Sequence, residues 1–205
     1  MRKTKKDAEI TKESLITSAF EVLANTSYKA ARLEDIARAV GMTRGALYWH
    51  FKNKAALYNE LVNITFKESM MDLFSFLDSA APSIDKINGV LNYILGDKIK
   101  IHQKSAQIYN LLFIEKPDEL NDSLEMVEGW FASLFEKHDR ALKEGIEAGE
   151  IRDLDTDLQT RCFYNFLWGY FTNSDRFFST YDKGAIQNYV KENFIDSIAV
   201  NQNTN

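Results

Sequence analysis

Apolar residues recur at helical spacing along nearly the whole chain, with no sustained alternation of the kind that predicts strands. The first such stretch, residues 11–25, has its apolar positions at i, i+3, i+4 and i+7, namely Ile16, Ala19, Phe20 and Leu23. Two shorter stretches follow within residues 33–51. The pattern therefore predicts an almost entirely helical protein that begins with three short helices.

Residues 33–51 read LEDIARAVGMTRGALYWHF, which divides into two short helices separated by three residues. Gly41 stands where a residue with positive φ would end the first helix, and the hydroxyl of Thr43 can cap the second. Ala37 lets the two helices cross closely, because only a methyl group stands at the contact. This spacing predicts a helix-turn-helix. Residues 11–25 would be the third helix of a small domain at the start of the chain, which we call the head.

The second of these helices turns Leu47 and Phe51 inward and so presents polar and aromatic side chains outward. Arg44 can donate two hydrogen bonds to a guanine edge or contact a phosphate, and Gly45 permits close approach. The helix expected from Lys54 onward offers its amino terminus to a phosphate. These features predict a DNA-contacting set of Thr43, Arg44, Gly45, Tyr48, Trp49, His50, Lys52 and Lys54. The pattern alone also allows a helical hairpin whose aromatic residues lie in a core.

The run DIARAVGMTRGALYWHFKNKAALYNELV resembles the signature of the TetR family of bacterial repressors, and it is similar to the AcrR branch of multidrug efflux regulators. The resemblance implies an all-α fold of about nine helices. It also implies a helix-turn-helix DNA-binding domain over residues 1–53. Residues 54–205 would then form a larger helical domain for ligand binding and dimerisation.

The sequence departs from the family pattern at two places. Ser27-Tyr28 stands where the family usually has Gly followed by an aromatic residue, and Ala30-Ala31-Arg32 replaces the usual Thr or Ser cap of the second helix. A lost hydroxyl cap costs about 1 kcal/mol and removes a usual phosphate contact. Arg32 could replace that contact, so we add Arg32 to the predicted DNA-binding residues.

No Pro or Gly interrupts the chain between Lys54 and Pro82, which predicts a long helix that joins the head to the body. Its later half is apolar on nearly every face, as in a helix surrounded by others. One carboxylate, Glu68, continues an apolar stripe made by Leu57, Leu61 and Ile64. A carboxylate there needs a partner, water or a cationic ligand, so Glu68 is either an ordinary solvated or paired group or a ligand-binding one.

Similar apolar stripes predict the later helices at about residues 83–95, 104–115, 124–149, 156–178 and 186–198. His138 falls within the stripe of the third of these, where a satisfied core histidine is expected and a switch is the alternative. Asp155 stands where it can cap the fourth helix. Cys162 lies among aromatic residues of that helix and is expected to be buried and inert.

By resemblance, the body encloses a pocket for a small hydrophobic ligand, and the last two helices pair with their copies in a homodimer. Adaptable aromatic and Met side chains suit such a pocket. The candidate ligand-binding residues are Phe66, Glu68, Met70, Phe74, Tyr109, Phe113, Trp130, Phe131, Phe163, Phe166 and Tyr170. The candidate dimer residues are Trp168, Gly169, Tyr189, Phe194 and Ile198. Aromatic residues at this spacing also make an ordinary helical core, and that alternative stays open.

The net charge of −5 hides an uneven distribution along the chain. Residues 1–60 carry eleven Lys and Arg against seven Asp and Glu, whereas residues 61–205 carry fourteen against twenty-three. A basic head on an acidic body is the charge pattern of a DNA-binding protein. One cysteine and no long uncharged apolar segment indicate a cytoplasmic protein that neither crosses nor binds a membrane.

The sequence gives no support for a catalytic or metal-binding motif. His50, His102 and His138 show no metal-ligand spacing, and no glycine-rich phosphate loop is present. We therefore predict no enzyme activity, no metal and no cofactor.

The features together predict a homodimeric transcriptional repressor that binds a palindromic operator in double-stranded DNA. Two copies are needed because one short recognition helix touches few base pairs. A small hydrophobic effector would release the repressor, and the AcrR-like head favours efflux-pump genes. A TetR-type regulator of fatty-acid metabolism that senses acyl thioesters is the nearest alternative, and a helical enzyme or adaptor is the alternative of another class.

Overall fold

The computed structural model describes residues 14–22, 26–96 and 108–200. Within these ranges the ordered elements are helices, and the one extended contact is an antiparallel bridge between Ile151 and Ala199. The all-α prediction is confirmed. The chain divides into two compact units, residues 1–67 with 107–127 and residues 68–106 with 128–205. This division differs from the predicted boundary between residues 53 and 54, because the first unit keeps residues 54–67 and gains a later segment.

The first unit contains the helix-turn-helix and the segments packed around it. Residues 14–22 are helical, and the predicted ends of this helix lie outside the described residues. The elements that follow are α2 (Leu33–Ala39), α3 (Arg44–His50), the beginning of α4 (Lys54–Leu77), the π-helix η1 (Asn110–Glu115), the 3-10 helix η2 (Asp118–Leu120) and the beginning of α7 (Asn121–Glu147). Its core holds Leu15, Ala19, Ile36, Leu47, Leu57, Tyr58 and Leu61.

Tyr58 is fully buried in this core, and its hydroxyl has no hydrogen-bond partner. The ring of Tyr28 meets it edge-on with centroids 5.0 Å apart. Burial raises the pKa of the Tyr58 phenol well above its ordinary value, so the group stays neutral. The molecule therefore carries the desolvation cost of a hydroxyl without the compensating hydrogen bond.

Replacing Tyr58 by phenylalanine is expected to raise the free energy of unfolding by about 1 kcal/mol, because the unsatisfied hydroxyl is removed without leaving a large cavity. Urea unfolding measures the effect. Tyr93→Phe is the control, since the Tyr93 hydroxyl is hydrogen-bonded to Asp72 and Ser69 and its removal should destabilise the protein. A Tyr58→Phe variant as destabilised as Tyr93→Phe would contradict the prediction.

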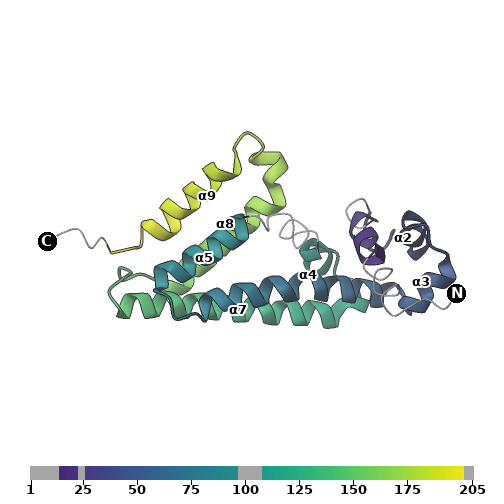
Figure 1. Cartoon of the computed structure of the whole chain (residues 1–205), viewed down its shortest axis with the longest axis horizontal. Coiled ribbons are helices and arrows are strands. Elements are labelled where there is room, and N and C mark those ends of the chain that lie inside the picture. The colour runs from purple at the N-terminus through teal and green to yellow at the C-terminus, as the bar shows by residue number, and fades with distance from the viewer. Residues whose placement is uncertain (1–13, 23–25, 97–107, 201–205) are drawn as a thin grey trace. The chain divides into compact units, whose positions relative to one another are not determined.

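The second unit is built from α5 (Ser83–Leu95), α8 (Thr156–Phe177), α9 (Lys183–Lys191), the π-helix η3 (Glu192–Asp196) and the later parts of α4 and α7. Helix α9 packs against α5 (Figure 1). Asp155 caps α8 as predicted, because its Oδ1 accepts from the Leu158 amide at 2.9 Å. The predicted stripe on α5 is confirmed where it is buried, at Ile87, Leu91, Ile94 and Leu95.

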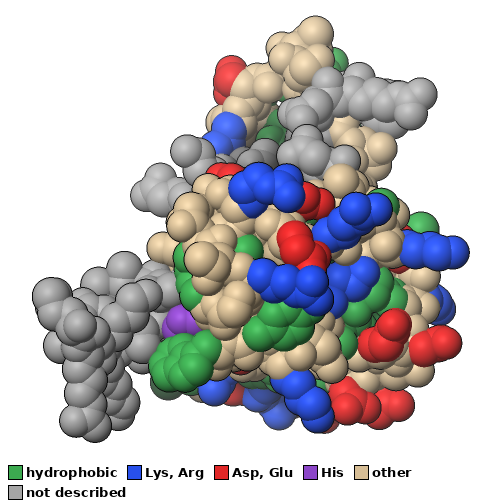
Figure 2. All heavy atoms as spheres, turned by 90° about the vertical axis from the view of Figure 1, so that its right-hand side faces the viewer, with side chains coloured by type: hydrophobic (Ala, Val, Ile, Leu, Met, Phe, Trp, Pro, Cys, Tyr) green, Lys and Arg blue, Asp and Glu red, His purple; other side chains and the backbone are tan. Residues whose placement is uncertain are grey.

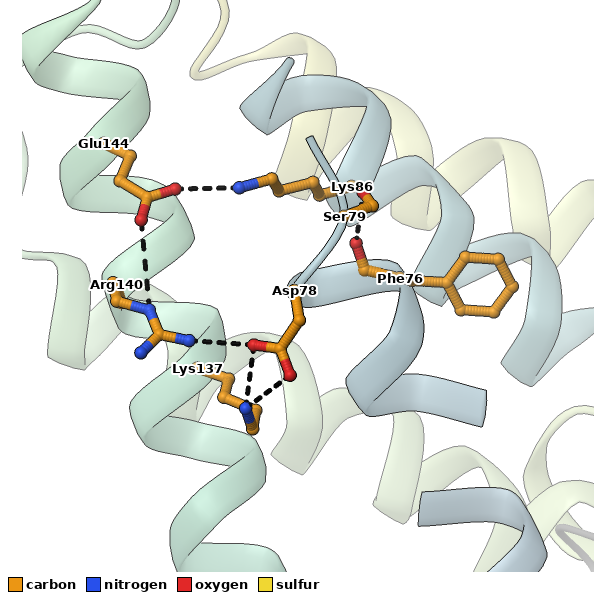
Figure 3. A network of polar contacts seen from close by, with 7 residues as sticks. All are labelled: Phe76, Asp78, Ser79, Lys86, Lys137, Arg140 and Glu144. Carbon is orange, nitrogen blue, oxygen red and sulfur yellow. Dashed lines mark hydrogen bonds and ion pairs between the residues drawn. The ribbon is translucent and has the colours of Figure 1, made fainter. Parts of the chain in front are cut away.

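A polar network joins the end of α4 to α5 and α7 within the second unit (Figure 3). Lys137 Nζ donates to both oxygens of Asp78 at 2.7 and 2.6 Å, and Arg140 Nη2 donates to one of them at 2.9 Å. Lys86 Nζ donates to Glu144 at 2.8 Å, and Arg140 Nε lies 3.9 Å from that carboxylate. The Lys86 side chain is only 10% exposed, so its charge needs the partner that Glu144 supplies.

Four side chains test predictions about burial. His138 is buried as expected, with its Nδ1 sharing a hydrogen bond of 3.1 Å with the Tyr164 hydroxyl. Cys162 is exposed, so the prediction of a buried thiol is wrong. Ile64 and Glu68 are also exposed, so the apolar stripe of Leu57 and Leu61 does not continue to Glu68. A carboxylate facing solvent needs no ligand, and the reason for proposing one at Glu68 is removed.

Candidate nucleic-acid interface

The turn between α2 and α3 has the geometry that the sequence predicts. Gly41 has a φ of +67°, and the amide of Met42 donates to the carbonyl of Ala37 at 2.8 Å. The hydroxyl of Thr43 accepts from the amide of Ala46 at 3.2 Å and so caps α3. Local bonds therefore fix where α2 ends and α3 begins.

Helix α3 has one buried and one exposed face. Leu47 is fully buried and Phe51 nearly so, whereas Trp49 is 74% exposed and Tyr48 42% exposed. His50 meets the Trp49 ring edge-on, with centroids 4.7 Å apart. This exposure contradicts the alternative of a hairpin with its aromatic residues in a core. Large exposed aromatic side chains on a seven-residue helix are available to a partner.

Arg44 lies at the first position of α3 and contacts two neighbours. Its Nε is 3.1 Å from Oε1 of Glu34, which is on α2. Its guanidinium carbon lies 5.3 Å from the ring centroid of Tyr48. The side chain is 69% exposed, so the guanidinium is oriented by protein groups while it still faces solvent.

The remaining predicted DNA residues differ in their surroundings. Nothing lies within 4 Å of the position that a Cβ of Gly45 would occupy, which leaves open space there. Lys52 is exposed. Arg32 is exposed at the N-cap position of α2 and makes no side-chain cap bond, as expected from the missing hydroxyl.

Lys54 has a structural role that the sequence did not indicate. Its Nζ donates to the carbonyls of Tyr28 and Ala31 at 2.6 and 3.3 Å, and it lies 4.1 Å from the Tyr28 ring centroid. Asn53 Oδ1 accepts from the amide of Ala56 at 2.8 Å in the first turn of α4. Lys54 Nζ is therefore engaged within the first unit, while a phosphate contact at this helix terminus stays a prediction.

Figure 2, which looks toward the side of the molecule that bears α2 and α3, shows Lys and Arg side chains interspersed with apolar ones. Acidic side chains lie between them and at one edge of the view. Two of the acidic groups on α2 are paired, Glu34 with Arg44 and Asp35 with Arg38, each at 3.1 Å. The face combines exposed cations with exposed rings, which suits contacts to both phosphates and bases.

A cavity of about 390 Å³ lies in the first unit and contains none of the predicted ligand residues. It is bounded mainly by charged residues: Tyr28, Lys29, Lys54, Glu115, Lys116, Pro117, Asp118 and Glu119. The amide of Tyr28 donates to Oε2 of Glu115 at 2.7 Å, and Lys116 has a φ of +46°. The sequence did not indicate that Glu115 would line this cavity. Glu115 ends a π-helix, which has more residues per turn than an α-helix, and the apolar spacing of this segment does not predict one.

The predicted ligand-binding residues fall in both units. Phe66, Tyr109 and Phe113 belong to the first, and the second holds Met70, Phe74, Trp130, Phe131, Phe163, Phe166 and Tyr170. Phe66, Met70, Phe163 and Tyr170 are buried, and the other aromatic residues of the set are half-buried. Tyr109 and Phe113 stack with centroids 4.1 Å apart. A role in ligand binding stays a prediction for these residues.

The predicted dimer residues lie on α8, α9 and the segment after α9. Tyr189 is 53% exposed, and Trp168 is half-buried beside Phe131. Nothing lies within 4 Å of the position that a Cβ of Gly169 would occupy. Ile198 is buried, and its carbonyl accepts from the Arg152 amide at 2.9 Å. Ile198 therefore packs within its own unit, and we correct its assignment to a dimer surface.

The described residues bear on metal binding and on membrane insertion. They include no group of three or more His, Cys, Asp or Glu side chains placed to hold a metal ion. Among the helices formed by those residues, none has the length and apolar character needed to span a membrane.

Comparison with known proteins identifies the head. Residues 15–61 match the family described as bacterial regulatory proteins, tetR family. Over 60 residues the chain is 40% identical to the HTH-type transcriptional regulator AcrR of Shigella flexneri, an alignment that covers 29% of this chain and 28% of AcrR. The chain therefore matches little more than a quarter of that relative's length, and the similarity concerns the helix-turn-helix head.

Two solved structures share the fold over almost the whole chain. NalD, the secondary repressor of the MexAB-OprM multidrug efflux pump in Pseudomonas aeruginosa, has a TM-score of 0.70 at 22% identity and covers 96% of this chain and 99% of its own. The transcriptional regulator FadR from Bacillus subtilis, in complex with stearoyl-CoA, has a TM-score of 0.66 at 23% identity, with 91% and 98% covered. At these identities the likeness shows the fold alone.

The matched residues 15–61 contain α2, the Gly41 turn, α3 and its Thr43 cap. The described chain also has the all-helical fold of the two regulators. Residues 15–61 of this chain therefore match the tetR family of bacterial regulatory proteins, and the head is similar to that of AcrR.

Proposed function

We propose that this chain is a transcriptional repressor that reads double-stranded DNA with α3. The observation that carries the proposal is the exposed face of α3, where Arg44, Tyr48 and Trp49 face solvent from a helix fixed by the Thr43 cap. A helix of this kind fits the major groove, where Arg can donate two hydrogen bonds to guanine. Neighbouring cations at Arg32 and Lys52 would contact phosphates.

The repressor acts as a homodimer on a palindromic operator. A seven-residue recognition helix contacts few base pairs, so two copies about 34–36 Å apart on the duplex supply the specificity. The surface that favours pairing is on α8 and α9, where Leu158 and Tyr189 are more than half exposed and Gly169 permits close helix approach. Large exposed apolar side chains on two helices are typical of a protein interface.

Replacing Trp168 by glutamate is expected to weaken the homodimer by about 2 to 4 kcal/mol, or at least thirtyfold in Kd, because a charge would be buried in the proposed interface on α8 and α9, the seam. Sedimentation velocity measures the change. Tyr189→Glu tests the same surface at an exposed position, and Tyr181→Glu is the control because Tyr181 is 62% exposed between α8 and α9. Unchanged sedimentation of both seam variants would place the interface elsewhere.

A small hydrophobic effector releases the repressor by binding more tightly to the state with lower DNA affinity. Similarity of the head to AcrR and of the fold to NalD favours efflux-pump genes as targets. The fold similarity to FadR, solved with stearoyl-CoA, supports an acyl thioester as the alternative effector. The aromatic and Met residues named above are the proposed walls of the effector site.

Fluorescence anisotropy of labelled duplexes from upstream of its own and neighbouring genes tests this function. Tight binding that weakens steeply as salt rises is expected for a repressor. Release by hydrophobic cationic drugs would support efflux control, whereas release by long-chain acyl thioesters would support lipid control. Absence of sequence-specific binding in a genome-wide selection would overturn the proposal.

A further inference from the structure

Glu34 stands on the DNA-facing side of the head, where an acidic residue opposes binding to phosphates. It lies in the first turn of α2, and its side chain is 39% exposed. Its Oε1 is 3.1 Å from Nε of Arg44 on α3, so the ion pair joins the two helices of the helix-turn-helix. An exposed ion pair contributes about 0 to 1 kcal/mol to stability, which gives little reason for an acidic residue here.

The geometry of the contact gives Glu34 a different role. The carboxylate approaches Arg44 through Nε, at the side of the guanidinium. The two terminal Nη groups form the fork that donates a bidentate pair to guanine O6 and N7. The same guanidinium also lies over the Tyr48 ring, with 5.3 Å between the guanidinium carbon and the ring centroid. Glu34 and Tyr48 together therefore restrict the orientation of the fork.

The negative charge of Glu34 also favours sequence-specific over nonspecific DNA binding. A carboxylate beside Arg44 neutralises the cation and repels phosphates, so it lowers affinity for any DNA regardless of sequence. It also restricts Arg44 from turning to a phosphate, which is the contact that carries no sequence information. Discrimination between operator and other DNA then depends on the base contact.

We propose that Glu34 is a specificity-determining positioning residue: it holds Arg44 for guanine readout and suppresses nonspecific binding. The inference rests on the proposed DNA-binding function. Asp35 provides a matched comparison, because it lies next on α2 and pairs with Arg38 at the same distance of 3.1 Å. Arg38 is on α2 itself and is not on the recognition helix, so the Asp35 pair orients no base-reading group.

The test compares Glu34→Gln with Asp35→Asn, since each removes one negative charge. The probes are a duplex selected from a random library by the wild-type protein, the same duplex with 7-deazaguanine, and an unrelated duplex. Glu34→Gln is expected to raise affinity for the unrelated duplex and to lower the ratio of selected to unrelated affinity about tenfold. It should also lose sensitivity to 7-deazaguanine. Asp35→Asn should change both affinities by the same factor.

A second background separates positioning from simple charge. In an Arg44→Ala protein, Glu34→Gln should no longer change the ratio, because no guanidinium remains to be positioned. Equal behaviour of Glu34→Gln and Asp35→Asn, with the ratio intact, would overturn the inference while the DNA-binding function stands. Failure of the wild-type protein to select any duplex would overturn that function as well. Matched thermal unfolding curves confirm that both variants are folded.

Discussion

An Arg44→Ala protein is expected to lose operator affinity by about 2 to 6 kcal/mol, at least thirtyfold in Kd, while its fold and dimer remain intact. A bidentate arginine–guanine pair contributes about 1 to 3 kcal/mol of discrimination, and both half-sites of a homodimer change together. The side chain is 69% exposed, so its removal leaves no cavity in the head. Anisotropy titration at fixed salt measures the affinity.

Arg38→Ala is the control for the loss of a positive charge. Arg38 is on α2, its side chain is 78% exposed, and its ion pair with Asp35 resembles the pair of Arg44 with Glu34. Arg38→Ala should weaken operator and unrelated DNA by a similar small factor. Equal losses in the two variants on every duplex would show that Arg44 contributes charge alone and does not read a base.

Acidification is expected to destabilise the second unit through His138. Burial lowers the pKa of this imidazole from its ordinary 6.5 to about 3, partly opposed by the charge of Asp139. The unfolded chain therefore takes up a proton below pH 6.5 that the folded protein rejects until about pH 3. The contribution of neutral His138 to the free energy of unfolding is complete above pH 6.5. Between pH 6.5 and about pH 3 it falls by about 1.4 kcal/mol per pH unit.

The paired variant His138→Leu with Tyr164→Phe removes the titrating group and its hydrogen-bond partner together. Its free energy of unfolding should fall less steeply with acid, by about 3 kcal/mol relative to the wild type at pH 4. Urea unfolding between pH 7 and pH 4 measures this. Tyr164→Phe alone keeps the imidazole and should keep the wild-type slope. Parallel slopes in all three proteins would show that His138 titrates normally in the folded state.

Local signals predicted the recognition element well. The end of α2, the Thr43 cap and the inward side of α3 each depend on residues within about one helical turn, which periodicity and capping rules describe. The outward placement of Arg44, Tyr48 and Trp49 follows from these, since burying Leu47 leaves the opposite face exposed. The exposed face of α3 was therefore predictable from the sequence, whereas the packing of Lys54 against the Tyr28 and Ala31 carbonyls was not.

Predictions failed where burial depends on neighbours far away in the sequence. The Cys162 thiol is exposed although its helix is rich in aromatic residues, because helical spacing does not show which face a neighbouring helix covers. The stripe drawn along α4 to Glu68 failed for the same reason. This helix contributes residues 54–67 to one unit and later residues to another, so its buried face need not continue in one line.

The sequence by itself determined a helical protein with a helix-turn-helix near its start, because helix periodicity, Gly41 and Thr43 act over a few neighbouring residues. Only the tertiary structure decided which charges meet. It placed the Glu34 carboxylate beside Arg44. It also let Lys54 Nζ donate to the carbonyls of Tyr28 and Ala31, and the Tyr28 amide donate to Glu115. Such contacts depend on the packing of separate segments, which no local pattern encodes.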